Sequence, residues 1–471
     1  MKYISAWDFI LVPLYLFLAF VVARATQNNK LQSDPDYKYY LSGLFAKLFG
    51  GLGLAFVYTF YYNGGDTIEF WRDCMVYNSL MFHDFACWLR IMGGSTDLLW
   101  FWCFDPYETG IPYYYNYDSR SHNVPRFLNL LTLFTASSYY ALTILTAWAS
   151  YPGVWRLFKV LSSEYPELRK QMAISVLFVP SVFFWGSGVM KDTLTFSAAC
   201  WFTVGMYKIV LKRNAVFGYI IVVILSTYVM ISIRPYIFVA LMPGVVIWVL
   251  FNQLKRVDNK VVKFLIAPII GLTALGIIAF VMSRTSSSLG DYGSMDQVLN
   301  KAVATQQDLK RDAYKGNSFD IGTFDASIGG ILSKLPAAVW AGLFRPTFLD
   351  VNNIVMLISA IENTILLFFF LRVFFRAGPM GFFRSLSAEP TALFAMTFAI
   401  FFAFSVGLTT ANFGSLVRYK IPSVPFFLAG LYITEYLHRK NKLEGLQKEQ
   451  DKLESAKAAA GFTNRPKTGS I

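Results

Sequence analysis

Long apolar runs alternate with short polar connectors along almost the whole chain, and this pattern predicts helices that cross a membrane. An apolar run of roughly 17–25 residues can span the hydrocarbon core of a bilayer as an α-helix. We expect about eleven spans, the first at about 8–24. The other expected spans lie at about 48–62, 128–149, 172–188, 193–211, 216–233, 236–251, 264–283, 351–373, 391–409 and 421–437. The sequence therefore predicts an all-α fold, a polytopic transmembrane helix bundle.

The composition agrees with a membrane protein. The chain has 471 residues, of which 55% are hydrophobic and 18% aromatic, and this is too apolar for a soluble protein of that length. A net charge of +13 is also common among nucleic-acid-binding proteins, but here the basic residues lie in short clusters between the apolar runs. In that position they orient a membrane protein and contact anionic lipid. We therefore predict membrane lipids as partners, and no nucleic acid.

The basic connector between the first two runs predicts the orientation of the bundle. Its basic residues are Arg24, Lys30, Lys38 and Lys47. Cytoplasmic loops are enriched in lysine and arginine, so we expect this connector inside the cell. A signal peptide is the alternative for the first run, but its start carries Asp8 and lacks a clean positive segment, so we expect a retained span. The prediction is a multi-pass protein of the cytoplasmic (inner) membrane, with its N-terminus outside and its C-terminus inside.

Two long loops are expected on the outer side, at residues 63–127 and 284–350. In the first loop acidic residues outnumber basic ones, as expected for a translocated segment. The apolar parts of these loops, at 82–104 and 331–349, are broken by charges and by glycine or proline. This pattern favours interfacial or re-entrant helices over further spans.

The end of the chain differs from the rest in composition. It is rich in lysine and glutamate and has the composition of a helix without a hydrophobic face. We expect a transmembrane domain at 1–438, followed at 439–471 by a cytoplasmic charged helical tail that is solvated and contacts anionic lipid electrostatically.

Three of the four cysteines, Cys74, Cys87 and Cys103, lie in the first outer loop. Their spacing is not that of a metal site. In an oxidising compartment one disulfide among these three is expected, and the spacing leaves the pair open.

The second expected span ends abruptly at two glycines and two carboxylates. Gly64 and Gly65 permit a sharp turn, and Asp66 and Glu69 lie three residues apart, so they share a face if a helix restarts there. A polar loop cap is the simpler interpretation. The alternative is a reactive site that is open to water at the outer end of this span. In such a site Asp66 is the first candidate for a catalytic residue, and Glu69 is a lesser partner.

Several cations are expected at the outer ends of spans, against the usual charge bias. These residues are Lys191, Arg234, Arg345, Arg418 and Lys420. A cation held there beside apolar surface needs an anionic partner, although contact with lipid headgroups alone is the simpler reading for any one of them. As a set they predict a site for a lipid phosphate or a glycan. Arginines would neutralise the leaving phosphate, and a carboxylate would deprotonate an incoming sugar hydroxyl.

Three segments carry a resemblance to a known group of proteins. They are Tyr61–Glu69, Pro180–Asp192 and Asn412–Pro422. These segments resemble parts of bacterial surface-polysaccharide membrane proteins of the glycosyltransferase-C-like and O-antigen-polymerase-like families. The resemblance implies an integral membrane glycosyltransferase or glycan polymerase that uses a polyprenyl-(di)phosphate-linked sugar donor for cell-surface polysaccharide synthesis. Other envelope-biosynthesis proteins are further candidate partners.

The resemblance also implies roles for particular residues. An acidic residue in the first outer loop of such families is the catalytic base or a metal contact, and Asp66 takes that position. Outer arginines contact the lipid phosphate or the glycan, and they match Arg234, Arg345 and Arg418. The chain departs from the family because its acid follows the second expected span and not the first. Whether a divalent cation binds near Asp66 stays open, and no nucleotide cofactor is expected.

Two other functions remain as alternatives. A transporter or flippase of a lipid-linked glycan would use the same arginines, and Glu362 within an apolar span would then couple to protons. A non-catalytic membrane scaffold of an envelope complex is the third reading. Hydrolase and ATPase activities are not indicated, because neither a Ser/His/Asp order nor a glycine-rich phosphate loop stands out.

Overall fold

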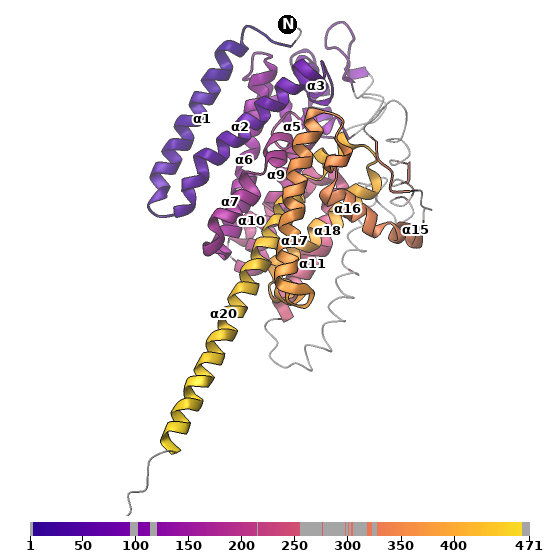
Figure 1. The fold of residues 1–471 in the computed structure, drawn as a ribbon. Helices are drawn as coiled ribbons and strands as arrows, with labels where there is room; N and C mark the ends of the chain where they lie inside the picture. Colours follow the sequence, from indigo (N-terminus) through magenta and orange to yellow (C-terminus); the bar gives the residue numbers. More distant parts are fainter. Residues whose placement is uncertain are drawn as a thin grey trace, which may run out of the picture.

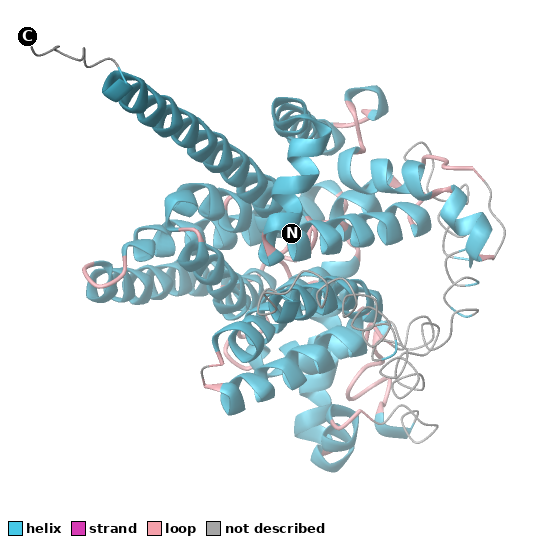
Figure 2. Cartoon of the chain, turned by 90° about the horizontal axis from the view of Figure 1, so that it is seen from below, coloured by secondary structure: helices cyan, strands magenta, loops and turns pink. Residues whose placement is uncertain are grey.

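The computed structural model describes residues 3–94, 102–113, 120–213, 215–254, 318–322 and 327–463, with a few isolated positions between 276 and 304. The described part is built from helices, and no strand occurs in it (Figure 2). This confirms the predicted all-α fold. All but one residue of the expected span at 264–283, and about half of the expected loop at 284–350, lie outside the described residues.

Six of the described helical segments are long and apolar enough to cross a membrane, which agrees with a multi-pass membrane protein. They are Asp8–Leu31, Pro35–Tyr61, Lys191–Lys212, Val216–Ile233, Met356–Ala388 and Pro390–Thr409. The first of these is α1 (Asp8–Leu31), and the last is α18 (Pro390–Thr409). The remaining bounds are α2 (Tyr40–Phe56), η2 (Val57–Tyr61), α3 (Asp66–His83), α4 (Phe85–Met92), α5 (Asn123–Thr132), α6 (Tyr139–Glu164), α7 (Arg169–Leu177), α8 (Pro180–Trp185), α9 (Lys191–Met206), η6 (Tyr207–Lys212), α10 (Val216–Ile233), α11 (Pro235–Leu254), α15 (Ile328–Ser333), α16 (Leu335–Phe344), η9 (Phe348–Asp350), α17 (Ile354–Ala388), α19 (Phe413–Tyr419) and α20 (Val424–Thr463), with short 3-10 turns at Pro35–Tyr39 and Pro166–Leu168.

Two of the expected spans are divided by local breaks. At 128–149 the chain ends α5 and restarts as α6, because Ala136 and Ser137 take positive φ angles and Ser138 then caps the new helix by accepting the amide hydrogen of Ala141 at 2.9 Å. The same hydroxyl donates to Asp8 of α1. At 172–188 the break falls before Pro180, which lacks an amide hydrogen and begins α8.

The bundle core forms around α9 and α18. Helix α9 packs against α6 and α10, and α18 packs against α11, α16 and α20. Helices α16 and α18 approach each other so closely that a Cβ on Gly342 would collide with the carbonyl oxygen of Ala403, and one on Gly407 with that of Ala338. Small residues permit this backbone contact, as is usual between membrane helices. The short apolar α16 therefore lies within the bundle, in the part of the sequence expected to be interfacial or re-entrant.

Helices α17 and α20 reach the end of the bundle farthest from α3 (Figure 1). Helix α17 bends at Gly378, whose φ is 67°, just before Pro379. Helix α20 continues without a break through residue 438 and leaves the bundle as a single projecting rod (Figures 1 and 2). The charged tail is thus helical up to Thr463 and continuous with the last apolar helix.

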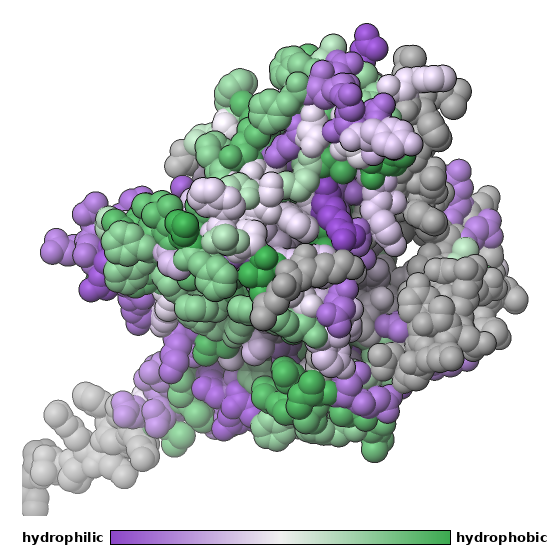
Figure 3. Space-filling view, turned by 90° about the horizontal axis from the view of Figure 1, so that it is seen from above, coloured by the Kyte–Doolittle hydropathy of each residue, from purple (hydrophilic) through white to green (hydrophobic). Residues whose placement is uncertain are grey.

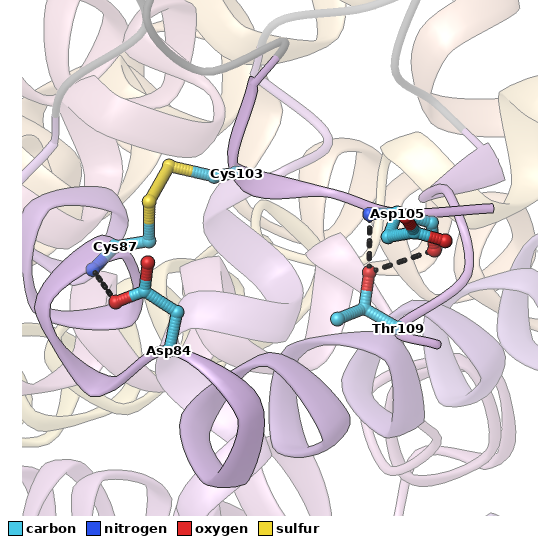
Figure 4. The surroundings of a disulfide bond; sticks show 5 residues. All are labelled: Asp84, Cys87, Cys103, Asp105 and Thr109. Carbon is cyan, nitrogen blue, oxygen red and sulfur yellow. Dashed lines mark hydrogen bonds between the residues drawn. A yellow bond between two sulfur atoms is a disulfide. The ribbon is translucent and has the colours of Figure 1, made fainter. Parts of the chain in front are cut away.

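The segment after α3 has a small core of its own. Its buried side chains are Tyr77, Leu80, Trp88, Ile91 and Phe104. A disulfide joins Cys87 to Cys103 (Figure 4). The other two cysteines, Cys74 and Cys200, are free and buried. Asp84 begins α4 by accepting the amide hydrogen of Cys87 at 2.9 Å. The structure thus resolves the pairing that the spacing left open.

Candidate functional site

The turn between η2 and α3 places Asp66 at the start of a helix. Asn63, Gly64 and Gly65 all have positive φ angles, which glycine adopts at little cost. The amide of Gly64 donates to the carbonyl oxygen of Tyr58 at 3.0 Å and closes the turn. Asp66 is therefore the first residue of α3, where unpaired backbone amides favour a carboxylate.

A second carboxylate, that of Asp192, lies in the first turn of α9. Its side chain is only 1% exposed. Arg234 compensates this buried charge with two hydrogen bonds, from Nη1 to Oδ1 at 2.6 Å and from Nη2 to Oδ2 at 3.1 Å. Such a bidentate pair is the strongest arrangement of an arginine with a carboxylate. The side chain of Arg234 is itself 5% exposed, so this pair is the buried end of the site.

Arg418 joins the two carboxylates. Its Nε donates to Oδ2 of Asp192 at 2.8 Å, and its Nη1 lies 2.7 Å from Oδ2 of Asp66. The side chain of Arg418 is 13% exposed and that of Asp66 is 39% exposed. Burial therefore decreases from the Asp192–Arg234 pair through Arg418 to Asp66. We call this set the four-charge cluster: Asp66, Asp192, Arg234 and Arg418. Its two acids and two bases give a formal charge of zero.

Each member of the four-charge cluster lies at a helix end that suits its charge. Both carboxylates lie in the first turn of a helix, whereas Arg234 is the C-cap of α10 and Arg418 lies in the last turn of α19. Helix dipoles stabilise these placements by about 0.3–1 kcal/mol each. Four helix termini therefore converge on one polar point. Seen from above, hydrophilic surface reaches the middle of this end of the molecule between areas of hydrophobic side chains (Figure 3).

Tyrosine side chains surround the two guanidinium groups. Arg234 lies 4.4 Å above the ring of Tyr419 and donates to the hydroxyl of Tyr236 at 3.1 Å. Arg418 lies 5.4 Å from the same Tyr419 ring. Burial lowers the pKa of Arg418, but the carboxylates of Asp192 and Asp66 outweigh it and raise the pKa above the ordinary value. The guanidinium of Arg418 is therefore a permanent cation, paired with the buried Asp192 on one side and with the more exposed Asp66 on the other.

The structure separates Glu69 from this cluster. Glu69 pairs with Arg72 at 3.0 Å, one turn farther along α3. Arg72 is 45% exposed, so the pair lies on the surface. Lys191 is the first residue of α9 and directly precedes Asp192.

Arg345 belongs to a different group. Its Nη2 and Nε contact the two oxygens of Asp350 at 2.5 and 3.2 Å, and its guanidinium lies within about 5 Å of the rings of Phe319 and Phe413. Burial raises the pKa of Asp350, but hydrogen bonds from Arg345 and Thr347 lower it overall. Arg345 is therefore paired with Asp350, five residues along the chain.

Lys420 is buried, and its hydrogen bonds connect segments that are far apart in the sequence. Its ammonium group donates to the carbonyl oxygens of Leu343 and Arg345 at 3.2 and 3.1 Å and to Oδ1 of Asn363 at 2.5 Å. These contacts use all three of its hydrogen atoms. Of the residues predicted for the site, the structure thus brings Asp66, Arg234 and Arg418 together, and places Glu69, Arg345 and Lys420 in other contacts.

Asp192 is the one member of the four-charge cluster for which the sequence predicted no role. It lies directly before the expected span at 193–211, and an acid at the start of an apolar run was the available signal. Glu362, the candidate proton carrier, accepts hydrogen bonds from the amide and hydroxyl of Ser181 at 2.8 and 2.5 Å.

Within the described ranges, no group of three or more histidine, cysteine or acidic side chains could hold a metal ion.

An apolar cavity of about 440 Å³ lies between α5, α6, α9 and α10. Leu194, Ala198 and Trp201 of α9 line it. With 100° per residue, these side chains lie on the face of α9 opposite Asp192. The helix therefore separates the cavity from the four-charge cluster.

Comparisons with known protein families, with characterised proteins and with solved structures find no match to this chain.

Proposed function

We propose that the chain is an integral membrane glycosyltransferase or glycan polymerase that uses a polyprenyl-(di)phosphate-linked sugar donor at the outer face of the cytoplasmic membrane, for cell-surface polysaccharide synthesis. The observation that carries the proposal is the position of Arg418 between a buried carboxylate, Asp192, and an accessible one, Asp66. This arrangement combines a fixed cation with a carboxylate that can change partners.

The buried half of the four-charge cluster would hold the cation in place. Asp192 and Arg234 are almost fully enclosed, so separating them would leave an uncompensated buried charge, at a cost of several kcal/mol. The contact between Arg418 and Asp66 is more exposed and is correspondingly weaker. An anionic donor phosphate at the mouth would therefore compete with Asp66 for Arg418, and the Asp192–Arg234 pair would stay closed.

Release of Asp66 would prepare the base for transfer. The Asp66 carboxylate takes the proton of the acceptor hydroxyl while that oxygen forms a bond to the anomeric carbon of the donor sugar. The bond from the anomeric carbon to the phosphate oxygen breaks, and its electron pair stays on the phosphate. The guanidinium of Arg418 stabilises the charge that develops there. No nucleotide is consumed in this reaction.

The disulfide supports the orientation that the proposal needs. Disulfides persist in oxidising compartments, and Cys87–Cys103 is linked to Asp66 through α3 and the start of α4. We therefore infer that α3 and α4 face the extracytoplasmic side, and that the N-terminus, two candidate spans earlier, is outside as well. The proposal also keeps about eleven spans in total, with the C-terminus inside. The short helix α4 of the first outer loop would lie at the interface.

A labelled polyprenyl-diphosphate sugar and the purified chain in proteoliposomes test the proposal. Asp66→Asn is expected to reduce product formation by about 10²- to 10⁴-fold, the usual contribution of a general base. Glu108→Gln is a matched control, because Glu108 is an exposed carboxylate of the same outer segment, paired with His83 at 2.8 Å. It should retain activity.

Two outcomes would contradict the proposal. One is full transfer activity in Asp66→Asn, which would remove this carboxylate from the mechanism. The other is movement of the labelled lipid between leaflets, without product, at the same rate in the parent chain and in Asp66→Asn. That result would favour the flippase alternative.

A further inference from the structure

A cluster of arginines surrounds one carboxylate of α20. Glu435 of α20 contacts Arg372 at 2.8 Å, Arg439 at 2.6 Å and Arg376 at 3.7 Å. Helix α20 begins near Lys420 and the four-charge cluster, and Glu435 lies roughly 16 Å along its axis at about 1.5 Å per residue. We call these four residues the Glu435 cluster. It is distinct from the site proposed above.

The Glu435 cluster has an excess of positive charge. Three guanidinium groups face one carboxylate, so two positive charges are left over. Glu435 is 12% exposed, whereas Arg372, Arg376 and Arg439 are 40%, 62% and 58% exposed. Ion pairs at such exposed positions contribute little to stability, so the arginines can share an additional anion at little cost. The surface presented here is therefore complementary to a phosphate group.

An exposed apolar stripe on α17 leads to these arginines. Ile361, Ile365 and Phe368 are 45%, 62% and 68% exposed, and Arg372 follows one turn after Phe368. Steps of four and three residues keep side chains on one face of a helix. Arg372 itself lies 5.1 Å above the ring of Phe369, whose centroid is 4.6 Å from that of Tyr432. An aromatic platform thus orients the guanidinium at the end of the stripe.

We propose that the Glu435 cluster and this stripe bind an anionic phospholipid. The phosphate lies among the guanidinium groups, which supply parallel N–H donors for it. One acyl chain lies along the stripe of α17, where apolar side chains face the hydrocarbon region. The lipid is a bound component of the membrane end of α20, and this inference does not depend on the transferase proposal.

Lipid titration of the purified full-length protein in a nonionic detergent tests the inference. Native mass spectrometry would compare the binding of dioleoyl phosphatidylglycerol with that of dioleoyl phosphatidylcholine, which has the same chains and no net charge. Arg376→Gln removes the most exposed arginine and leaves Glu435 with two partners, so the fold should persist. We expect phosphatidylglycerol to bind about five-fold more weakly to this variant, and about 25-fold more weakly to Arg376→Gln/Arg439→Gln.

The matched control is Arg384→Gln. Arg384 is also an exposed arginine of α17, but it follows the bend at Gly378, and the variant changes the net charge by the same amount as Arg376→Gln. It should bind phosphatidylglycerol like the parent chain. Equal weakening in the two variants would overturn the inference in favour of diffuse charge. Thermal protection by inorganic phosphate equal to that by the same concentration of phosphatidylglycerol would overturn the lipid assignment.

Discussion

Arg418 and Asp192 are 226 positions apart in the chain, and their side chains meet at 2.8 Å. This contact joins the last turn of α19 to the first turn of α9, so the two halves of the chain share one buried ion pair. Because Asp192 is also held by Arg234, the guanidinium of Arg418 cannot follow a substrate outward. The edge of the guanidinium that contacts Asp66 is therefore held at a fixed place.

The two carboxylates of the four-charge cluster should respond differently to the same substitution. Asp192→Asn leaves Arg234 buried beside a neutral amide, which should destabilise the protein by about 3–5 kcal/mol. Asp66→Asn changes a contact at the exposed end, so its cost should stay below about 1 kcal/mol. Thermal unfolding of the two variants in one detergent checks this. Equal losses of stability would mean that burial does not determine how much each carboxylate of the four-charge cluster contributes to stability.

Arg418→Lys should affect substrate use more than folding. A lysine keeps the charge but has no planar fork, so it has one nitrogen in place of the separate Nε and Nη1 donors that Arg418 directs at Asp192 and Asp66. The apparent KM for the lipid-linked donor should rise about ten-fold, equivalent to one charge-assisted hydrogen bond of about 1.5 kcal/mol. Arg72→Lys, at the surface pair with Glu69, is the comparison variant. If Arg418→Lys has the donor KM of the parent chain, Arg418 does not bind the phosphate.

Removal of the disulfide should loosen one segment and leave the bundle intact. Cys87 and Cys103 close a loop with a sequence separation of 16, for which the entropic stabilisation is about 3 kcal/mol. Cys103→Ala should therefore increase proteolysis near residues 102–113, because non-covalent contacts alone then hold this segment to α3 and α4. Among them are the small core around Trp88 and Phe104, the hydrogen bond that the amide of Tyr113 donates to Asp73, and the pair of Glu108 with His83. Protection of the segment equal to that in Cys74→Ala would contradict this expectation.

The ion pair of Arg345 with Asp350 should give a stability difference that depends on pH. The pKa of Asp350 is lowered in the folded state, so the pair contributes stability above the ordinary pKa of about 3.9 and loses it as the pH falls through the folded value. The parent chain should exceed Asp350→Asn in melting temperature at pH 6, and the difference should shrink below about pH 4. A constant difference would show that the charge of Asp350 is not involved.

Close contact between α16 and α18 should make Gly342 intolerant of a side chain. Gly342→Ala would press a methyl group on the carbonyl oxygen of Ala403, and overpacking of this kind costs about 1–3 kcal/mol. In contrast, Gly445→Ala on the projecting part of α20 meets no atom within 4 Å and should stabilise the helix by about 0.5–1 kcal/mol. The melting temperatures of both variants should move in opposite directions. A shift of the same sign in both would contradict this account.

Local pattern was sufficient to predict the helices whose apolar length is uninterrupted, such as α1, α10 and α18. It was not sufficient for α5 and α6, because the break at Ala136 and Ser137 depends on a cap whose hydroxyl also contacts Asp8, far away in the chain. The predicted spans at these positions followed hydropathy alone.

For the candidate site, Arg234 and Arg418 were predicted because basic residues are unusual at the outer ends of spans. Asp66 was predicted because it follows the turn at Gly64 and Gly65. The same argument included Arg345 and Lys420, whose contacts with Asp350 and Asn363 require knowledge of the tertiary packing. Asp192 received no role because its two arginine partners come from distant helices. The expected helix ends could have predicted the cluster, because each of the four charges has the sign that the dipole of its helix terminus favours.

The unbroken course of α20 has a mechanical consequence. With 40 residues at about 1.5 Å each, the helix is roughly 60 Å long, and it begins just after Lys420. A straight rod of this length converts a tilt of a few degrees at its base into a displacement of several ångströms at its tip. Any tilt of α20 as a whole would therefore displace Thr463 more than the residues within the bundle.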